Sequence, residues 1–280
     1  MSLYKKLQQR AHDSKPIRIA LIGAGKFGSM YLSQIPRTPG IHLVGIADLS
    51  PDRAQAALRR VGWQDDQFGA TSVADAVRKG STYITSDAGA LINDNAIELV
   101  IEATGVPAAG IEHALRCIEH GKHIIMVNVE ADVLAGPYLA KRAAEAGVIY
   151  SMASGDQPAL IAEMVDWART IGLEVVCAGK GTKYLPAYHA STPKTVWGHY
   201  GFSEEQVAGG DFNAQMFNSF LDGTKSALEM AAVANACDLQ VPDDGLGFPA
   251  CGVDDLPALL KPAQDGGLLP CKRMVAAVSS

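Results

Sequence analysis

The glycine-rich sequence GAGKFG at residues 23–28 places the strictest limit on the fold of this chain. It directly follows the apolar run IRIALI at 17–22, which is typical of a buried strand, and apolar residues at helical spacing follow it. A second apolar run, at 41–47, ends at Asp48, which lies 20 residues beyond Gly28. An acidic residue at that distance from a strand–glycine loop–helix unit is typical of a dinucleotide-binding fold.

Each residue of the loop has a physical task in such a fold. Gly23 permits the tight turn, Gly25 lets the backbone approach the pyrophosphate, and Gly28 lets the helix pack closely on the strand. The N–H groups of the helix N-terminus, at Lys26 and Phe27, face the phosphates, whose charge the helix dipole favours. The loop therefore predicts dinucleotide binding, with an ordinary strand–helix turn as the alternative.

The residues after the second strand leave the choice of dinucleotide open. Asp48 can accept hydrogen bonds from a free ribose 2′-hydroxyl and would repel a 2′-phosphate, which favours NAD. Ser50 and Arg53 lie just beyond and could hold a 2′-phosphate if Asp48 turns aside. A solvent-exposed helix face is the alternative interpretation of Arg53.

Strand and helix patterns alternate through the first half of the chain. Further strands are predicted at 99–103, 123–127 and 148–150, and helices at 51–60, 108–119 and 132–146. This alternation predicts a parallel sheet that is covered by helices on both faces. Thr104 and Gly105 follow one of these strands at its carboxyl end, where ligands of such sheets bind, and we expect this turn to flank the nicotinamide.

The pattern changes near residue 150. Helices are predicted at 156–171, 211–221 and 224–236, and a strand at 173–178, whereas 179–203 shows no clear period and 274–280 is not expected to complete a structural unit. The aromatic and basic side chains of 179–203 favour a functional loop. We therefore predict an α/β chain with two domains. A dinucleotide-binding Rossmann domain with a doubly wound parallel sheet covers 1–155, and an α+β substrate or dimerisation domain covers 156–280.

Basic side chains of the second half are candidates for substrate binding. Lys180, Lys183 and Lys194 lie within fifteen residues, together with His189. Ammonium groups near one cleft suit a phosphate or carboxylate substrate. A solvated basic loop is the alternative.

Asp222 and Lys225 precede an apolar helical run. Asp222 could cap the helix, but Lys225 would then lie in the first turn, where a cation opposes the helix dipole. This unfavourable position indicates a role for Lys225 in proton transfer. Glu130 and Asp156 stand at two further strand-to-helix junctions and could hold a divalent cation or serve as acid and base. For Asp156 a helix cap is the alternative.

Charge and cysteine content limit the partners. The chain has 24 Lys and Arg against 30 Asp and Glu, a net charge of −6, which argues against binding to nucleic acid or to an anionic membrane. No apolar run reaches the length of a membrane span. The five cysteines are scattered without a CxxC pair, which argues against a zinc site and suits a reducing, cytoplasmic location.

Longer strings carry a family resemblance. IALIGAGKFG, VIEATG, GKHIIMVNVEADVLAG and GVIYSMASGDQPAL resemble the homoserine dehydrogenase family, over about residues 16–240. SGDQPAL, GKGTKYLPAYHASTPKTVWGHYG and FLDGTKSALEMAAVANA resemble a divergent branch of it, the 1-deoxy-D-xylulose 5-phosphate reductoisomerase-like proteins. There are two departures from homoserine dehydrogenases: Val129 replaces a lysine, and Asp222 and Lys225 lie one residue closer than their Asp-x-x-x-Lys pair. The branch usually ends in a β-rich SAF domain, which we expect to be absent or truncated here.

The resemblance implies a cytoplasmic, homodimeric, NADPH-dependent enzyme of isoprenoid precursor synthesis, with NAD as the other possible cofactor. Its reaction would be the reductive isomerisation of 1-deoxy-D-xylulose 5-phosphate to 2-C-methyl-D-erythritol 4-phosphate. Lys225 would donate a proton near the reacting oxygen, with Asp222 orienting it, while the basic residues of 180–194 bind phosphate. Mg²⁺ or Mn²⁺ could polarise the substrate oxygens. Two alternatives stay open: a homoserine dehydrogenase-like or sugar-acid dehydrogenase or oxidoisomerase, and a dinucleotide-sensing protein without turnover.

Overall fold

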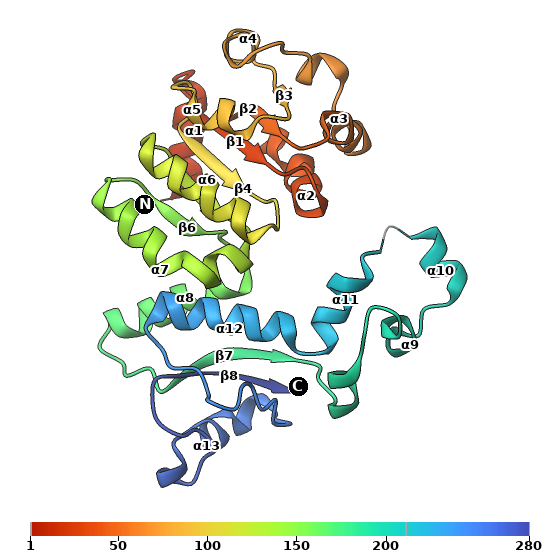
Figure 1. Cartoon of the computed structure of the whole chain (residues 1–280). Coiled ribbons are helices and arrows are strands. Elements are labelled where there is room, and N and C mark those ends of the chain that lie inside the picture. Colours follow the sequence, from red (N-terminus) through yellow and green to blue (C-terminus); the bar gives the residue numbers. More distant parts are fainter. Residues whose placement is uncertain (1, 211, 280) are drawn as a thin grey trace. The chain divides into compact units, whose positions relative to one another are not determined.

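The computed structural model describes residues 2–210 and 212–279. The chain divides into two compact units, Met1–Ala153 and Ser154–Ser280 (Figure 1). Among the described helices, none is both long enough and apolar enough to cross a membrane.

The first unit contains a parallel sheet of six strands within its described residues, in the order β3-β2-β1-β4-β5-β6. The strands are β1 (Ile17–Ile22), β2 (Ile41–Ala47), β3 (Tyr83–Thr85), β4 (Leu99–Glu102), β5 (His123–Met126) and β6 (Tyr150–Met152). This is the strand order of the doubly wound Rossmann fold, so the predicted fold class is confirmed. The order reverses between β1 and β4, and ligands of such sheets bind at the carboxyl ends of the strands there.

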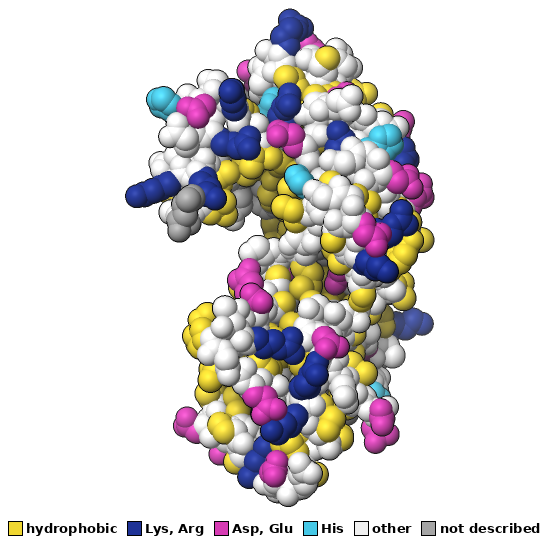
Figure 2. All heavy atoms as spheres, turned by 90° about the vertical axis from the view of Figure 1, so that its left-hand side faces the viewer, with side chains coloured by type: hydrophobic (Ala, Val, Ile, Leu, Met, Phe, Trp, Pro, Cys, Tyr) yellow, Lys and Arg dark blue, Asp and Glu magenta, His cyan; other side chains and the backbone are white. Residues whose placement is uncertain are grey.

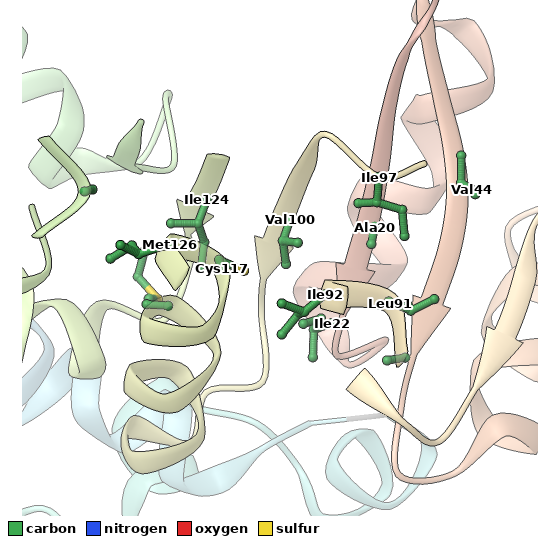
Figure 3. Close-up of a cluster of buried hydrophobic side chains, with 14 of the residues drawn as sticks. Ala20, Ile22, Val44, Leu91, Ile92, Ile97, Val100, Cys117, Ile124 and Met126 are labelled. Carbon is green, nitrogen blue, oxygen red and sulfur yellow. The ribbon is translucent and has the colours of Figure 1, made fainter. Parts of the chain in front are cut away.

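Helices cover both faces of this sheet. They are α1 (Leu3–His12), α2 (Lys26–Gln34), α3 (Pro51–Arg60), α4 (Val73–Lys79), α5 (Ala88–Asn93), α6 (Pro107–Glu119) and α7 (Val129–Glu145), with short 3-10 turns at Ile35–Arg37 and Asp65–Phe68. Ile19 and Leu21 of β1 join the core under α2 and α3, whereas Ala20 and Ile22 join the core under α4 to α7. Alternate residues of a strand face opposite layers. Figure 3 shows the second layer, with Ile22 and Val100 on adjacent strands.

Two boundaries in the first unit differ from the predicted ones, and a local hydrogen bond explains the first difference. The helix predicted at 132–146 begins at Val129, because the Asn128 side chain accepts a hydrogen bond from the Ala131 N–H at 3.1 Å and caps it. The strand predicted at 148–150 is β6, which runs from Tyr150 to Met152.

The second unit has a parallel sheet of two strands in its described part, β7 (Cys177–Thr182) and β8 (Met274–Ser279). Its helices are α8 (Gln157–Thr170), α9 (Val196–Tyr200), α10 (Glu204–Gly209), α11 (Ala214–Leu221), α12 (Thr224–Cys237) and α13 (Leu256–Leu259), with 3-10 turns at Pro186–Ala190, Val253–Asp255 and Ala263–Asp265. Val165 of α8, Met230 of α12 and Val275 of β8 share one buried cluster, so both helices pack against the sheet.

Three expectations for this unit were wrong or incomplete. Residues 274–279 do form a structural element, since β8 pairs with β7 along its whole length, from Cys177 with Met274 to Thr182 with Ser279. The strand predicted at 173–178 begins only at Cys177 and continues into the segment that we expected to be a loop. The helix predicted from residue 211 starts outside the described residues; the described helix begins at Ala214, where the Asn213 side chain caps it.

Candidate functional site

The glycine loop between β1 and α2 has the backbone geometry that a dinucleotide requires. Gly23 has φ of +94°, and a Cβ there would lie 2.7 Å from the Ala103 carbonyl oxygen. A Cβ at Gly28 would lie 2.6 Å from the Gly23 carbonyl oxygen, so both glycines are needed by the fold itself. Around Gly25, by contrast, a Cβ would meet no atom within 4 Å. The open space at Gly25 is where a bound pyrophosphate would approach the backbone.

The start of α2 fits an anionic ligand as well. Gly25 is the N-cap residue and has no side chain to cap the helix, and Lys26 and Phe27 form its first turn. The first N–H groups of a helix lack partners within the helix, and they bind phosphate in folds of this kind. The residues present therefore fit a nicotinamide dinucleotide.

Asp48 lies directly after β2 and is turned toward the glycine loop. Its Oδ2 accepts a hydrogen bond from the Ala24 N–H at 2.9 Å. Its Oδ1 accepts hydrogen bonds from the Ser50 N–H at 2.9 Å and from Arg53 Nη2 at 2.8 Å. Burial alone would raise the pKa of the Asp48 carboxyl, but these hydrogen bonds and the Arg53 charge outweigh it and hold the pKa below its ordinary value.

Arg53 stands in the first turn of α3, beside this carboxylate. The Ser50 side chain caps α3 by accepting a hydrogen bond from the Arg53 N–H at 3.4 Å. The Arg53 side chain is 65% exposed, whereas the Asp48 side chain is 3% exposed. Of this ion pair at the end of β2, the cation is thus the exposed group and the carboxylate the buried one.

A buried network of polar side chains is hydrogen bonded to the turn that follows β4. The Thr104 hydroxyl donates a hydrogen bond to Glu102 Oε1 at 2.5 Å and accepts one from the Val106 N–H at 3.2 Å. Asn128 Nδ2 donates to the same hydroxyl at 3.4 Å, and His113 Nδ1 lies 3.3 Å from Glu102 Oε1. This network joins the carboxyl ends of β4 and β5 and fixes the turn that we expected beside the nicotinamide.

Two further residues shape this turn. Gly105 has φ of +67°, a left-handed conformation that glycine adopts without strain. Glu102 is fully buried, and its Oε2 has no hydrogen-bond partner within the described residues. The sequence analysis predicted Thr104 and Gly105 but missed Glu102, because a single acid inside an apolar strand has no spacing that marks it.

A second buried carboxyl in this unit belongs to Asp132 of α7. It accepts a hydrogen bond from the Tyr150 hydroxyl at 2.7 Å. Burial raises the pKa of Asp132, and the hydrogen bond from Tyr150 lowers it by less. Burial, together with the Asp132 charge, also raises the pKa of Tyr150 well above its ordinary value.

In the second unit, a buried carboxylate joins two of the predicted lysines. Lys180 of β7 donates a hydrogen bond to Glu229 Oε2, and Lys225 Nζ lies 3.9 Å from Glu229 Oε1. The side chain of Glu229 is 6% exposed, that of Lys180 14% and that of Lys225 25%. The sequence analysis missed Glu229, although its position four residues after Lys225 on one helix is the spacing of a helical ion pair.

Asp222 does not hold Lys225 in the way that we expected. Its Oδ1 accepts a hydrogen bond from the Thr224 N–H at 2.9 Å, and its Oδ2 accepts one from Asn218 Nδ2 at 2.9 Å. The carboxylate therefore stabilises the turn before α12, and the ion-pair partner of Lys225 is Glu229. Burial explains the pairing, since a nearly buried carboxylate needs a cation close to it.

An aromatic pair lies at the start of α12. The rings of Tyr184 and Phe248 stack with centroids 4.2 Å apart, and a Cβ at Gly223 would lie 3.3 Å from Phe248 and 3.6 Å from Tyr184. The Tyr184 hydroxyl lies 3.3 Å from His189 Nδ1. The predicted residue His189 is thereby connected, through Tyr184, to the helix that carries Lys225.

The other two predicted lysines are not part of this cluster. Lys183 and Lys194 are exposed, and neither forms an ion pair with any residue that the structure describes. On the face that Figure 2 shows, basic side chains are interspersed with acidic ones. Because Lys183 and Lys194 are exposed and Lys180 is 14% exposed, the alternative interpretation as solvated surface fits them better than it fits Lys180.

The predicted metal candidates lie in different units. Asp156 caps α8, with its Oδ1 accepting a hydrogen bond from the Gln157 N–H at 2.9 Å, and Glu130 stands in the first turn of α7. No group of three His, Cys, Asp or Glu side chains within the described ranges could hold a metal ion. All five cysteines are described, and all are free thiols. Neither unit therefore offers, among its described residues, a metal site built from three such side chains.

Comparisons with known proteins give a separate match for each of the two units. Residues 17–153 match the GFO/IDH/MocA oxidoreductase family with an NAD-binding Rossmann fold. Residues 155–280 match the catalytic domain of oxidoreductase DRL.

Individual proteins match the chain at low sequence identity. The chain is 28% identical over 114 residues to a homoserine dehydrogenase of Methylobacillus glycogenes, which covers 41% of this chain and 25% of that protein. A homoserine dehydrogenase structure from Thiobacillus denitrificans has a TM-score of 0.43 at 19% identity, over 56% of this chain and 34% of that one. A myo-inositol dehydrogenase from Lactobacillus casei, in complex with NAD(H) and myo-inositol, has a TM-score of 0.43 at 16% identity, over 65% and 50% of the two chains. The chain thus spans a quarter of the length of the curated relative that it matches.

Proposed function

We propose that this chain, whose first unit matches the GFO/IDH/MocA oxidoreductase family and whose second matches a DRL catalytic domain, is an NAD(P)-dependent oxidoreductase acting on a CH–OH group. The observation that carries the proposal is the cluster of Lys180, Lys225 and Glu229 in the second unit, in a chain whose first unit has a dinucleotide loop. A dinucleotide-sensing protein would need the loop but not the cluster.

The chemistry follows from what hydride transfer requires. A nicotinamide cofactor, when bound, supplies or takes up the hydride. The chain must then add or remove a proton at the oxygen of the same carbon. Lys225 is the more exposed of the two clustered lysines, and an ammonium group can donate a proton to a developing alkoxide. We therefore assign the proton donor to Lys225, with Lys180 adding positive charge beside it and His189 as a hydrogen-bonding group for an anionic substrate.

NADP(H) is the cofactor that the first unit favours. The two oxygens of Asp48 are already hydrogen bonded to Ala24, Ser50 and Arg53, so this carboxylate is turned away from the role of a ribose acceptor. The Arg53 guanidinium beside it is exposed and could bind a 2′-phosphate in a charge-assisted pair.

The finer proposal for the substrate is 1-deoxy-D-xylulose 5-phosphate. Its carbon skeleton would rearrange to an aldehyde phosphate, which one hydride from NADPH and one proton would reduce to 2-C-methyl-D-erythritol 4-phosphate. The support is the resemblance of the strings SGDQPAL and FLDGTKSALEM to the reductoisomerase-like branch, and the net positive charge of two lysines around one carboxylate.

A homoserine dehydrogenase-like oxidation is the second candidate, because a homoserine dehydrogenase is the curated relative that the chain matches. It needs hydride transfer without rearrangement. Val129 stands where that family carries a lysine, which makes this candidate the weaker one.

The test is to follow NADPH consumption with 1-deoxy-D-xylulose 5-phosphate, with and without Mg²⁺ or Mn²⁺, and beside NADH as the control. Homoserine and sugar acids are assayed in the oxidative direction in parallel, and products are identified by mass spectrometry. We expect a branched product, and at least about 100-fold slower turnover in Lys225→Ala with unchanged cofactor affinity, as for the loss of a general acid. Unaltered turnover in Lys225→Ala would remove the assignment. Cofactor binding without turnover of any of these substrates would leave the dinucleotide-sensing protein as the better interpretation.

A further inference from the structure

We infer that Glu229 gives the two lysines different tasks: it binds Lys180 as a fixed counter-ion and leaves Lys225 as the ammonium group that meets the substrate. Glu229 is then a positioning residue, because it acts through the lysines and does not itself contact the reacting atoms. The inference deepens the proposed function and rests on it for the role of Lys225.

The distances to the two carboxylate oxygens separate the lysines. Lys180 Nζ donates a hydrogen bond to Glu229 Oε2, whereas Lys225 Nζ stays 3.9 Å from Oε1, beyond hydrogen-bond length. The Lys180 side chain is 14% exposed and that of Lys225 is 25% exposed. The Lys180 ammonium group is therefore hydrogen bonded inside the protein. The Lys225 ammonium group has no hydrogen bond to Glu229 and is more accessible to a substrate.

The elements on which Lys180 and Lys225 lie favour Lys180 as the lysine that is held in a fixed position. Lys180 is on β7, which pairs with β8 along its whole length, so its backbone is held on a sheet. Lys225 is in the first turn of α12, where the helix dipole disfavours a cation. Glu229, one turn further along α12, is the opposite charge that offsets this cost for Lys225, while its hydrogen bond goes to Lys180.

Few other charges face Lys225. Lys180 is the charged residue of β7, and neither β8 nor α11 carries one. Asp222, between α11 and α12, has its two oxygens bound by Asn218 and the Thr224 N–H. Of the charged residues of α8, namely Glu163, Asp166 and Arg169, Arg169 donates to the Cys237 carbonyl at the opposite end of α12. Among the described residues, the ion pairs of Lys180 and Lys225 are both with Glu229, so these three side chains form one balance of charge.

This balance predicts opposite effects from two neutralising substitutions. In Glu229→Gln, Lys225 loses its counter-ion and faces only the Lys180 ammonium, so it gives up its proton at lower pH. In Lys180→Met, the buried carboxylate loses its hydrogen-bonded partner and takes Lys225 in its place, so Lys225 holds its proton to higher pH. Shifts of opposite sign require that the Lys225 ammonium is coupled to both side chains, whereas a Lys225 that is not coupled to the pair would show no shift in either variant.

The measurement is competitive acetylation of the protein over a pH series, with the modified fraction at Lys225 read by mass spectrometry. Relative to the parent chain, we expect the pH of half-maximal labelling to fall by about one unit in Glu229→Gln and to rise by about one unit in Lys180→Met, that is, about a tenfold change in labelling rate at one pH in each direction. Lys141, on the surface of the first unit, is the internal control and should not change in either variant.

The inference would be overturned if the labelling of Lys225 shifted in the same direction in both variants. It would also be overturned if the labelling did not shift in variants whose melting temperature equals that of the parent chain. If Glu229→Gln does not fold, the double variant Lys180→Met with Glu229→Gln removes the buried pair as a whole, and its labelling curve should lie at lower pH than that of Lys180→Met alone, because Lys225 has then lost its counter-ion as well. The labelling needs neither substrate nor cofactor. Opposite shifts without oxidoreductase turnover would therefore support the inference and reject the function. Turnover that needs Lys225, without opposite shifts, would reject the inference alone.

Discussion

Asp48 Oδ2 accepts a hydrogen bond from the Ala24 N–H at 2.9 Å, which ties the end of β2 to the middle of the glycine loop. The spacing of 20 residues between Gly28 and Asp48 predicted a carboxylate that accepts hydrogen bonds from a ribose hydroxyl. The structure instead makes this carboxylate a support of the loop, with Arg53 as the group left exposed. Predictions about the dinucleotide and about stability at low pH follow from this arrangement.

Replacing Asp48 by Asn should destabilise the chain in a pH-dependent way. Hydrogen bonds hold the pKa of the folded carboxyl below its ordinary value, so its contribution to stability is present above about pH 4 and is lost as the pH falls through the lower, folded value. We expect Asp48→Asn to unfold with about 1–3 kcal/mol less free energy at pH 7, and the difference to shrink below pH 4. Urea unfolding between pH 7 and pH 3 checks this, with the exposed Asp244→Asn as the control.

Two glycines of the loop should respond differently to the same substitution. Gly25→Val projects into empty space, so the fold should persist while dinucleotide affinity falls by at least about 100-fold, a loss of about 2.7 kcal/mol. Gly28→Val collides with the Gly23 carbonyl and should lower the melting temperature. Fluorescence titration with NADPH and thermal unfolding separate the two effects. An unchanged titration of Gly25→Val would contradict the assignment of the loop.

Arg53 should decide between the two dinucleotides. Loss of a charge-assisted hydrogen bond to a 2′-phosphate costs about 1.5–3 kcal/mol, so Arg53→Ala should weaken NADPH binding by roughly 10- to 100-fold and leave NADH binding nearly unchanged. Arg59→Ala is the matched control, since Arg59 is on the same helix and pairs with Asp65. Equal losses for both dinucleotides would mean that Arg53 acts only by holding Asp48.

Asp132 should behave oppositely to Asp48. Burial raises the pKa of this carboxyl in the folded chain, so its contribution is favourable at low pH and is lost as the pH rises through the raised value. Asp132→Asn can still accept the Tyr150 hydrogen bond and has no charge to bury. We expect it to be more stable than the parent at pH 8, on the order of 1 kcal/mol, and no more stable at pH 4. Melting temperatures between pH 4 and pH 8 test this, and a gain that is independent of pH would refute it.

Local pattern was enough to predict the fold class of the first unit and the elements around the glycine loop, although β3, α1, α4 and α5 were not predicted. The run 17–22, the glycine loop and the run 41–47 each carry their signal within a few residues, and parallel strands buried on both faces read as continuous apolar segments. Helix starts were less certain, because a single hydrogen bond such as that of Asn128 moves the boundary by a turn.

The second unit was harder because its partners are far apart in sequence. The strand β7 reads CAGKGT, which has low β-propensity, and it forms because β8 pairs with it almost a hundred residues later. The same holds for the site. The spacing of Lys225 and Glu229 is visible along one helix, but the contact between Glu229 and Lys180 exists only once α12 packs on β7.

The strand that the sequence analysis missed offers the sharpest stability test. Val275 of β8 is fully buried, in a cluster with Val165, Met230 and Val233. Val275→Ala removes two buried methyl groups and leaves a cavity, so we expect the free energy of unfolding to fall by about 2 kcal/mol. Val253→Ala is the same chemical change at a side chain that is 81% exposed, and it should cost less than about 0.5 kcal/mol. Urea unfolding of both variants measures the difference. Because the cost arises from packing, equal and small effects would show that 274–279 is not part of the core.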